Sequence, residues 1–177
     1  NCDSPKAVIS SYPPSFTPPD KINKGTGFGI VAKEFNDRGI LTMKGKGTAI
    51  KNLPAKPQKG AFIGAGFLFG PGSIIRDVPY DPNLYFFGEE VTLAVRLWTH
   101  GYDIYYPNAE LAYHDWERKK RKRTHFNDHK NWEELNRKSY QRVRHMLKME
   151  TSEKPAVLKD IDKFGLGSAR TLEQYQQ

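Results

Sequence analysis

The sequence has few of the residues that stabilise small secreted domains or cross membranes. Its 177 residues include a single cysteine, Cys2, which excludes an internal disulfide and a structural zinc site built on cysteines. No apolar run approaches the roughly 20 residues that span a bilayer, and the first residues lack the order of a signal peptide. The near absence of cysteine suits a reducing compartment, so we expect a cytoplasmic protein without a membrane segment.

Aromatic residues are plentiful by contrast. The 10 Phe, 9 Tyr and 3 Trp make up 12% of the chain, whereas disordered chains are poor in them. A folded monomer of this size buries about 70% of the surface of its extended chain. We therefore expect a folded domain, despite a polar mean hydropathy of −0.71.

The positive charge is concentrated in one segment. Residues 117–150 contain 12 Lys or Arg against 5 Asp or Glu, and residues 118–123 are six consecutive cations. Such a run can bind phosphate groups of a nucleic acid, a nucleotide or an anionic lipid by releasing counterions. It can equally be a solvated connector leading into a helix, which is the common case for charge runs. A basic nucleic-acid-binding module is therefore the alternative to an enzymatic function.

Short β-rich runs alternate with turn residues over most of the chain. We expect strands at 6–10, 62–69, 103–106 and 110–113, and a hairpin of residues 28–35 and 40–44 around a turn that ends in Gly39. Gly64 and Gly66 interrupt the apolar run at 62–69, which is typical of a bulge or of backbone that approaches a ligand closely. The fold class that these elements predict is α/β.

Two helices are expected in the second half of the chain. Residues 88–100 carry apolar side chains on most faces, which predicts a buried helix that begins after Gly88 and ends before Gly101. A half-exposed helix is expected at about 127–149, followed by a short helix near 170–175. We assign residues 1–116 to one portion of a domain, and 117–177 to a basic connector and a helical extension packing on it.

Glu89 and Glu90 are the first candidate functional residues. A carboxylate at a helix N-terminus is held ionised by free amide donors and can accept hydrogen bonds from sugar hydroxyls. An acidic pair in a first turn is also a common structural feature. His114 follows an apolar segment, where a neutral imidazole can bind a divalent metal or serve as a hydrogen-bonded core residue.

Two other acidic or histidine pairs are rejected as metal sites. His125 and His129 have the spacing of a metal pair on a helix but lack a third convincing ligand. Asp160 and Asp162 lie in a polar, lysine-rich tail with no strand leading into them.

Residues 61–116 contain a series of short motifs whose order is specific enough to compare with known families. The series is Ala65-Gly66-Phe67-Leu68-Phe69, Pro79-Tyr80-Asp81-Pro82, Phe87-Gly88-Glu89-Glu90, Arg96-Leu97-Trp98, Gly101-Tyr102-Asp103, Tyr106-Pro107 and His114. It resembles the catalytic half of the GlcNAc-transferase family that modifies hydroxyproline on a cytosolic ubiquitin-ligase adaptor, and its bacterial relatives. That family is similar to the mucin-type polypeptide GalNAc-transferases.

The resemblance implies a role for each matching residue. Ala65, Gly66, Gly88 and Arg96 would belong to the donor-sugar site, although Arg96 fits a structural role equally well. Glu89 would bind the donor sugar's hydroxyls, whereas the mucin-type enzymes carry an amide at the position of Glu90. His114 would be one metal ligand.

The resemblance also implies a GT-A fold, with a mixed sheet and flanking helices, and a hexosyltransferase reaction. A UDP-sugar, UDP-GlcNAc in the first instance, would donate its sugar to a protein or glycan hydroxyl with retention, assisted by Mn²⁺ or Mg²⁺. The family's nucleotide-binding half and its acidic metal pair find no match here, so we expect them upstream of Asn1. The chain alone would then be incomplete, and a catalytically dead fragment is a further alternative.

Overall fold

Four short strands form a mixed sheet at the centre of the molecule. The computed structural model describes residues 2–116 and 124–177. The sheet has the order β6-β8-β1-β7, with β1 at Ala7–Ser10, β6 at Gln58–Gly60, β7 at Leu68–Phe69 and β8 at Asp103–Tyr106. β1 and β8 run parallel although nearly a hundred residues separate them, and the two outer pairs are antiparallel.

A long hairpin lies beside this sheet, as the sequence predicts. β4 (Thr26–Phe35) pairs with β5 (Leu41–Ala49) in antiparallel register. The side-chain oxygen of Asn36 closes the turn by accepting hydrogen bonds from the backbone N–H groups of Arg38 and Ile40, each at 3.0 Å. Gly39 has a φ of 72°, a conformation in which other residues are strained.

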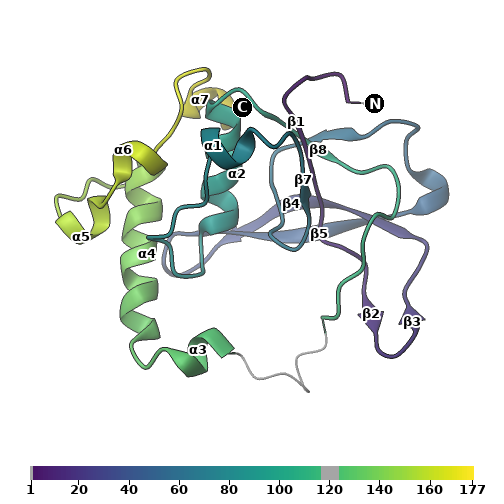
Figure 1. Cartoon of the computed structure of the whole chain (residues 1–177), viewed down its shortest axis with the longest axis horizontal. Helices are drawn as coiled ribbons and strands as arrows, with labels where there is room; N and C mark the ends of the chain where they lie inside the picture. The colour runs from purple at the N-terminus through teal and green to yellow at the C-terminus, as the bar shows by residue number, and fades with distance from the viewer. Residues whose placement is uncertain (1, 117–123) are drawn as a thin grey trace.

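The remaining elements are short. They are β2 (Phe16–Thr17), β3 (Lys21–Ile22), the 3-10 turn η1 (Ile50–Asn52), α1 (Ile74–Asp77), α3 (Thr124–Asp128), α5 (Pro155–Leu158), α6 (Ile161–Phe164) and α7 (Leu172–Tyr175). Figure 1 shows α4 (Trp132–Met146) to α6 on one side of the molecule and the β2–β3 hairpin on the other, with α2 (Glu89–Thr99) between them.

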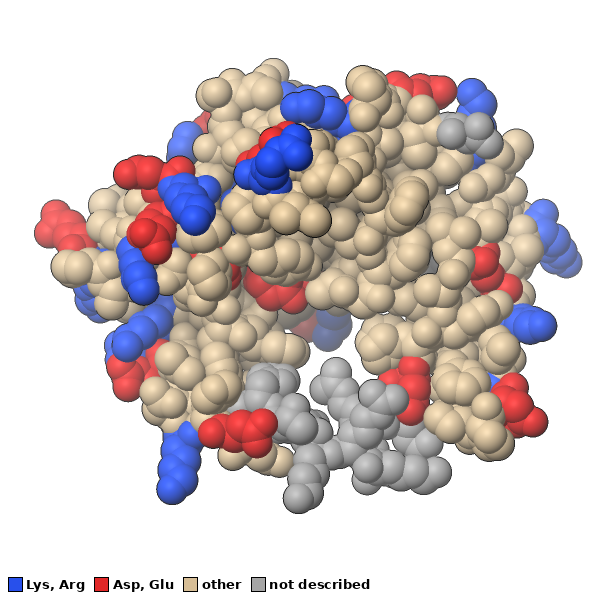
Figure 2. Space-filling view, in the orientation of Figure 1, with Lys and Arg blue, Asp and Glu red and all other residues tan. Residues whose placement is uncertain are grey.

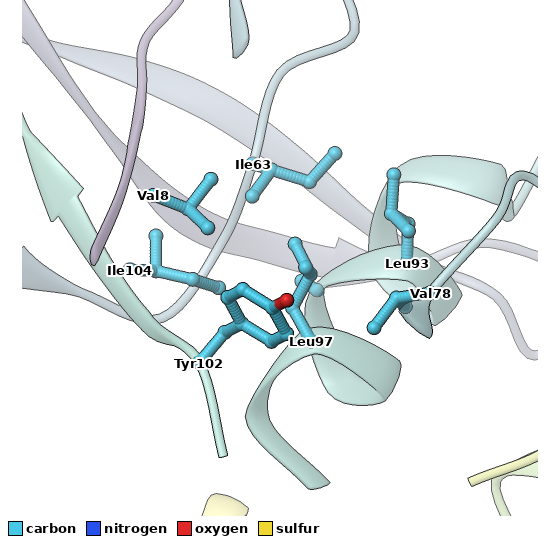
Figure 3. Close-up of a cluster of buried hydrophobic side chains, with 8 residues drawn as sticks. Val8, Ile63, Val78, Leu93, Leu97, Tyr102 and Ile104 are labelled. Carbon is cyan, nitrogen blue, oxygen red and sulfur yellow. The ribbon is translucent and has the colours of Figure 1, made fainter. Parts of the chain in front are cut away.

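The buried helix expected at 88–100 is α2, Glu89–Thr99. Gly88 and Gly101 flank it with positive φ angles of 91° and 85°. Its apolar side chains pack against the sheet, where Leu97 is fully buried. Figure 3 shows Leu93 and Leu97 facing strand residues such as Val8, so the helix and the sheet share one core.

The half-exposed helix expected at about 127–149 is divided. α4 covers Trp132–Met146, and α3 precedes it as a separate turn of helix. The first N–H of α4, that of Trp132, donates to the carbonyl of His129 at 3.1 Å, and Asn131 has non-helical dihedral angles. The Asn131 side chain makes no capping hydrogen bond, so the break between α3 and α4 lies in the backbone conformation at this residue.

A buried ion pair connects α4 to the turn that precedes α2. Arg142 Nε lies 2.6 Å from an Asp81 carboxylate oxygen, and both side chains are 1% exposed. The same guanidinium donates to the carbonyl of Val157 at 2.6 Å. Residues from the expected helical extension are therefore packed into the core of the preceding region.

One expected strand is wrong, and another is shorter than expected. Residues 110–113 form no strand, because Glu110 turns its carboxylate to the backbone N–H of Gly25 at 2.7 Å. In the run at 62–69 only Leu68 and Phe69 are paired as a strand. The segment before them turns at Gly64, whose N–H donates to the buried hydroxyl of Ser10 at 2.8 Å.

Candidate functional site

A cavity of about 760 Å³ lies where α2 begins. Its size is within the range of ligand pockets. Figure 2 shows this face of the molecule hollowed between the α4 side and the β2–β3 side. The lining comes from five segments: Tyr12, Pro13, Pro14, Ser15 and Asn23; Asn36, Ile40, Leu41, Thr42, Met43 and Gly45; Ala65 and Gly66; Phe86, Phe87, Gly88, Glu89, Glu90 and Val91; and His114 and Trp116.

Gly88 allows the start of α2 to lie close to α4. An added Cβ there would overlap the Val143 side chain, and the positive φ would strain any other residue. α4 can therefore pack directly against the start of α2. The first turn of α2, with its free amide groups, faces the cavity, and both Glu89 and Glu90 line it.

Both carboxylate oxygens of Glu90 are occupied by hydrogen bonds. The Tyr12 hydroxyl donates to one at 2.9 Å, and the Ala65 backbone N–H donates to the other at 2.7 Å. Burial, together with the charge of Glu90, raises the pKa of Tyr12, so its hydroxyl stays a donor. Glu90 thus connects the first turn of α2 to two other walls and fixes the backbone at Ala65.

Glu89 is in the opposite situation. Its Oε2 atom is buried and has no hydrogen-bond partner among the described residues. Burial, and secondarily the negative charge of Glu90, raises the pKa of Glu89 to about 7. An unpaired buried carboxylate is costly for a folded protein. A ligand that donates hydrogen bonds would remove that cost.

Three aromatic side chains, those of Tyr12, His114 and Trp116, form another part of the wall. The His114 ring stacks on Trp116 with a centroid distance of 4.0 Å, and Trp116 meets Tyr12 edge to face at 6.3 Å. The Trp116 indole N–H donates to the carbonyl of Pro13 at 3.0 Å, which holds the indole in place. His114 Nδ1 is buried and has no hydrogen-bond partner among the described residues.

The glycines at 64 and 66 have different surroundings. A Cβ added to Gly64 would lie 2.6 Å from the Tyr12 ring, so this glycine makes room for the ring. A Cβ added to Gly66 would lie 3.6 Å from Pro13 and 3.7 Å from the His114 ring, which are ordinary contacts. Gly66 therefore keeps open the space beside the imidazole.

The structure brings together six of the seven residues selected from the sequence. Ala65, Gly66, Gly88, Glu89, Glu90 and His114 all line the cavity. Arg96 does not line it. Its buried guanidinium donates to the carbonyls of Pro79 at 2.7 Å and Gly165 at 3.3 Å, so it connects α2 to two loops.

The sequence did not single out several lining residues. Phe86 and Trp116 are 40% and 42% exposed and, with Phe87 of the motif, give the cavity an apolar rim. The β5 side of the cavity, including Met43 and Gly45, belongs to a region that carries no motif. The run of aromatic residues just before Glu89 in the sequence could have predicted the rim. Nothing in the sequence of β5 predicts that it lies at the cavity.

The described residues show neither a grouped metal site nor a membrane-spanning helix. Within 2–116 and 124–177, no three His, Cys, Asp or Glu side chains are grouped so that they could hold a metal ion. In the same part of the chain, no helix has the length and apolar character needed to cross a bilayer. The basic run at 118–123 lies outside the described residues, so the nucleic-acid alternative stays a prediction. On the face drawn in Figure 2, lysines and arginines are mixed with acidic residues.

The chain was also compared with known protein families, curated proteins and solved structures. Residues 1–177, the whole chain, match the family described as Glycosyltransferase (GlcNAc). No curated protein and no solved structure matches it.

Proposed function

The chain belongs to the GlcNAc glycosyltransferase family, and on that premise we propose that its cavity binds the sugar of a UDP-sugar donor. The proposed donor is UDP-GlcNAc, and the proposed acceptor is a hydroxyl group of a protein or glycan. The anomeric configuration is retained. The observation that carries this proposal is the placement of Gly66, Glu89 and His114 around one cavity at the start of α2.

Glu89 binds the donor sugar in this proposal. Its buried, unpartnered oxygen would accept a hydrogen bond from a sugar hydroxyl, which gives the carboxylate the partner that the protein does not supply. The aromatic rim offers apolar surface to the sugar ring, as is usual in ligand pockets that have a few placed polar groups. Glu90 is a positioning residue, because its oxygens already bind Tyr12 and Ala65.

Retention requires the acceptor to approach from the face that the leaving group occupies. The acceptor oxygen would form a bond to the anomeric carbon as the bond to the diphosphate oxygen breaks, and a phosphate oxygen would take the acceptor proton. This chain contributes orientation: the sugar is held between Glu89 and the Ala65–Gly66 backbone. We place the reaction in the cytoplasm, as the resemblance implies.

For a divalent metal, Mn²⁺ or Mg²⁺, the described residues offer a single candidate ligand. His114 fits one coordination position, because its Nδ1 is buried and unpartnered among the described residues. Those residues group no further ligands with it, so on their own they do not fit a metal centre. Selective broadening of the His114 ring signals by Mn²⁺ would support this single-ligand role, and unchanged signals would remove it.

The decisive experiment compares two glutamates that both stand in the first turn of a helix. Glu89→Gln removes the charge of the carboxylate that would bind the sugar hydroxyls, whereas Glu133→Gln changes an exposed residue at the start of α4. In the full-length protein, UDP-GlcNAc binding is measured by calorimetry and sugar transfer by release of UDP. We expect Glu89→Gln to reduce both by orders of magnitude and Glu133→Gln to leave both unchanged. Normal binding and turnover in Glu89→Gln would remove Glu89 from the site.

A further inference from the structure

β5 has a free edge next to the cavity. Within the described residues β5 pairs with β4 alone, in a two-stranded sheet. Residues 44–47 of β5 are exposed. An exposed strand edge presents unpaired N–H and C=O groups that can pair with another extended chain.

The register of the hairpin identifies which backbone groups face outward. The carbonyl of Ile30 accepts a hydrogen bond from the Tyr106 hydroxyl at 2.5 Å, and the N–H of Thr26 donates to Glu110 at 3.3 Å. Both groups therefore point away from β5. In an antiparallel pair, the residue opposite such a residue also points its backbone groups away from its partner.

Gly45 lies opposite Ile30 in this register. Because the pattern repeats every second residue, the outward N–H and C=O groups of β5 are those of Met43, Gly45 and Gly47. Met43 and Gly45 also line the cavity. The free edge and the cavity wall are thus the same stretch of backbone, and at Gly45 no side chain separates them.

Two lysines lie on the face of β5 that points away from the cavity. Lys44 and Lys46 alternate with the outward residues, and both are exposed. A strand added to β5 would place every second side chain on the cavity face and the intervening ones beside these lysines. Pairing of β5 with β5 of a second copy around Gly45 would put Lys44 opposite Lys46, and like charges directly opposite one another are destabilising.

We propose that a polypeptide acceptor docks in extended form on the free edge of β5, as a third strand. Its hydroxyl side chain is turned into the cavity, and acidic residues on either side of it lie next to Lys44 and Lys46. This docking site for the acceptor rests on the proposed sugar transfer. Backbone pairing provides affinity, and the alternating side chains provide selectivity.

The first test leaves the protein unchanged and varies the peptide. The probe is a fluorescein-labelled peptide of about nine residues, a common strand length, in which Val and Glu alternate around one central Thr. Binding to the full chain is measured by fluorescence anisotropy. Two N-methylated forms remove alternate backbone N–H groups, one on Thr and Val, the other on Glu. We expect one form to lose binding and the other to keep it, because only one set of N–H groups faces β5.

The second test changes β5 at one atom. Gly45→Pro removes the outward N–H without removing a hydrogen bond to β4, and Gly45→Ala is the matched control that keeps it. Loss of one hydrogen bond predicts about tenfold weaker binding for Gly45→Pro than for Gly45→Ala. A peptide with Lys in place of Glu should bind more weakly than the acidic peptide.

Several results would overturn the proposal. Equal effects of the two N-methylated forms would show that the peptide does not add as a strand, and equal binding of acidic and basic peptides would exclude the role of the lysines. Absence of any peptide binding, or a dimer that forms through β5, would also refute it. UDP-GlcNAc binding is measured separately on the same sample. A chain that binds UDP-GlcNAc but not the peptide loses only the acceptor proposal.

Discussion

The adjacent residues Glu89 and Glu90 should respond in opposite directions to the same substitution. Glu89 has a buried oxygen without a partner among the described residues, whereas Glu90 accepts hydrogen bonds from Tyr12 and Ala65. We therefore expect Glu89→Gln to stabilise the fold at neutral to alkaline pH, and Glu90→Gln to destabilise it. This prediction concerns the free energy of unfolding and does not depend on donor or acceptor.

The magnitude for Glu89 follows from its pKa, which is raised from 4.5 to about 7. Each pKa unit corresponds to about 1.36 kcal/mol. The carboxylate is only partly buried, so solvent screening reduces the full value to about 1–2 kcal/mol. Because the folded state binds the proton more tightly than the unfolded state, stability falls as pH rises from about 4.5 to about 7. The gain from Glu89→Gln should therefore be absent below this window and complete above it.

For Glu90 the expected change has the other sign. A glutamine side chain can accept from the Ala65 N–H and donate to the Tyr12 hydroxyl, but both hydrogen bonds then lose the charge of the carboxylate. Hydrogen bonds to charged groups contribute about 1.5–3 kcal/mol, and we expect Glu90→Gln to lose an amount of that order at neutral pH.

The assay is urea denaturation of the wild type and both variants at several values between pH 4.5 and pH 8.5. The reasoning predicts that the curves of wild type and Glu89→Gln separate as pH rises, with the variant the more stable. Parallel pH profiles for these two proteins, or equal destabilisation by both substitutions, would refute the assignment of Glu89 as the unpartnered carboxylate.

Three further outcomes test the packing around the site. Arg142→Leu should cost about 3–5 kcal/mol in urea denaturation, because it leaves the Asp81 carboxylate buried and unpaired; the double change Arg142→Leu with Asp81→Leu should recover much of the loss. Gly64→Ala should lower stability by about 1–3 kcal/mol, because its Cβ would overlap the Tyr12 ring; an unchanged melting temperature would contradict this. Thr171→Ala removes a capping box at α7 and should cost about 1 kcal/mol, seen as faster exchange of the amides at the start of that helix.

Local sequence signals predicted the elements that local interactions determine. The hairpin was predictable because a turn ending in Gly39 separates two β-rich runs, and α2 because its apolar positions and flanking glycines agree. The division between α3 and α4 was missed, since residues 127–131 are all polar and contain neither Gly nor Pro to mark a break.

Long-range contacts account for what the sequence could not indicate. Glu110 binds the backbone of Gly25, so residues that look like a strand are used as a loop. Arg96 stands on the same helix as Glu89, yet its guanidinium points toward Pro79 and Gly165. The β5 wall of the cavity has no motif, because only the pairing of β5 with β4 and the packing of this hairpin bring Met43 and Gly45 to the cavity.

The Asp81–Arg142 contact has a consequence for anyone who divides this protein for study. Cutting the chain between the described segments, after residue 116 and before residue 124, would leave a lone anion in one fragment and a lone cation in the other. Each would have to be hydrated where the intact molecule is dry. The two fragments should therefore be insoluble or unfolded when expressed alone, and should recover native structure when produced together.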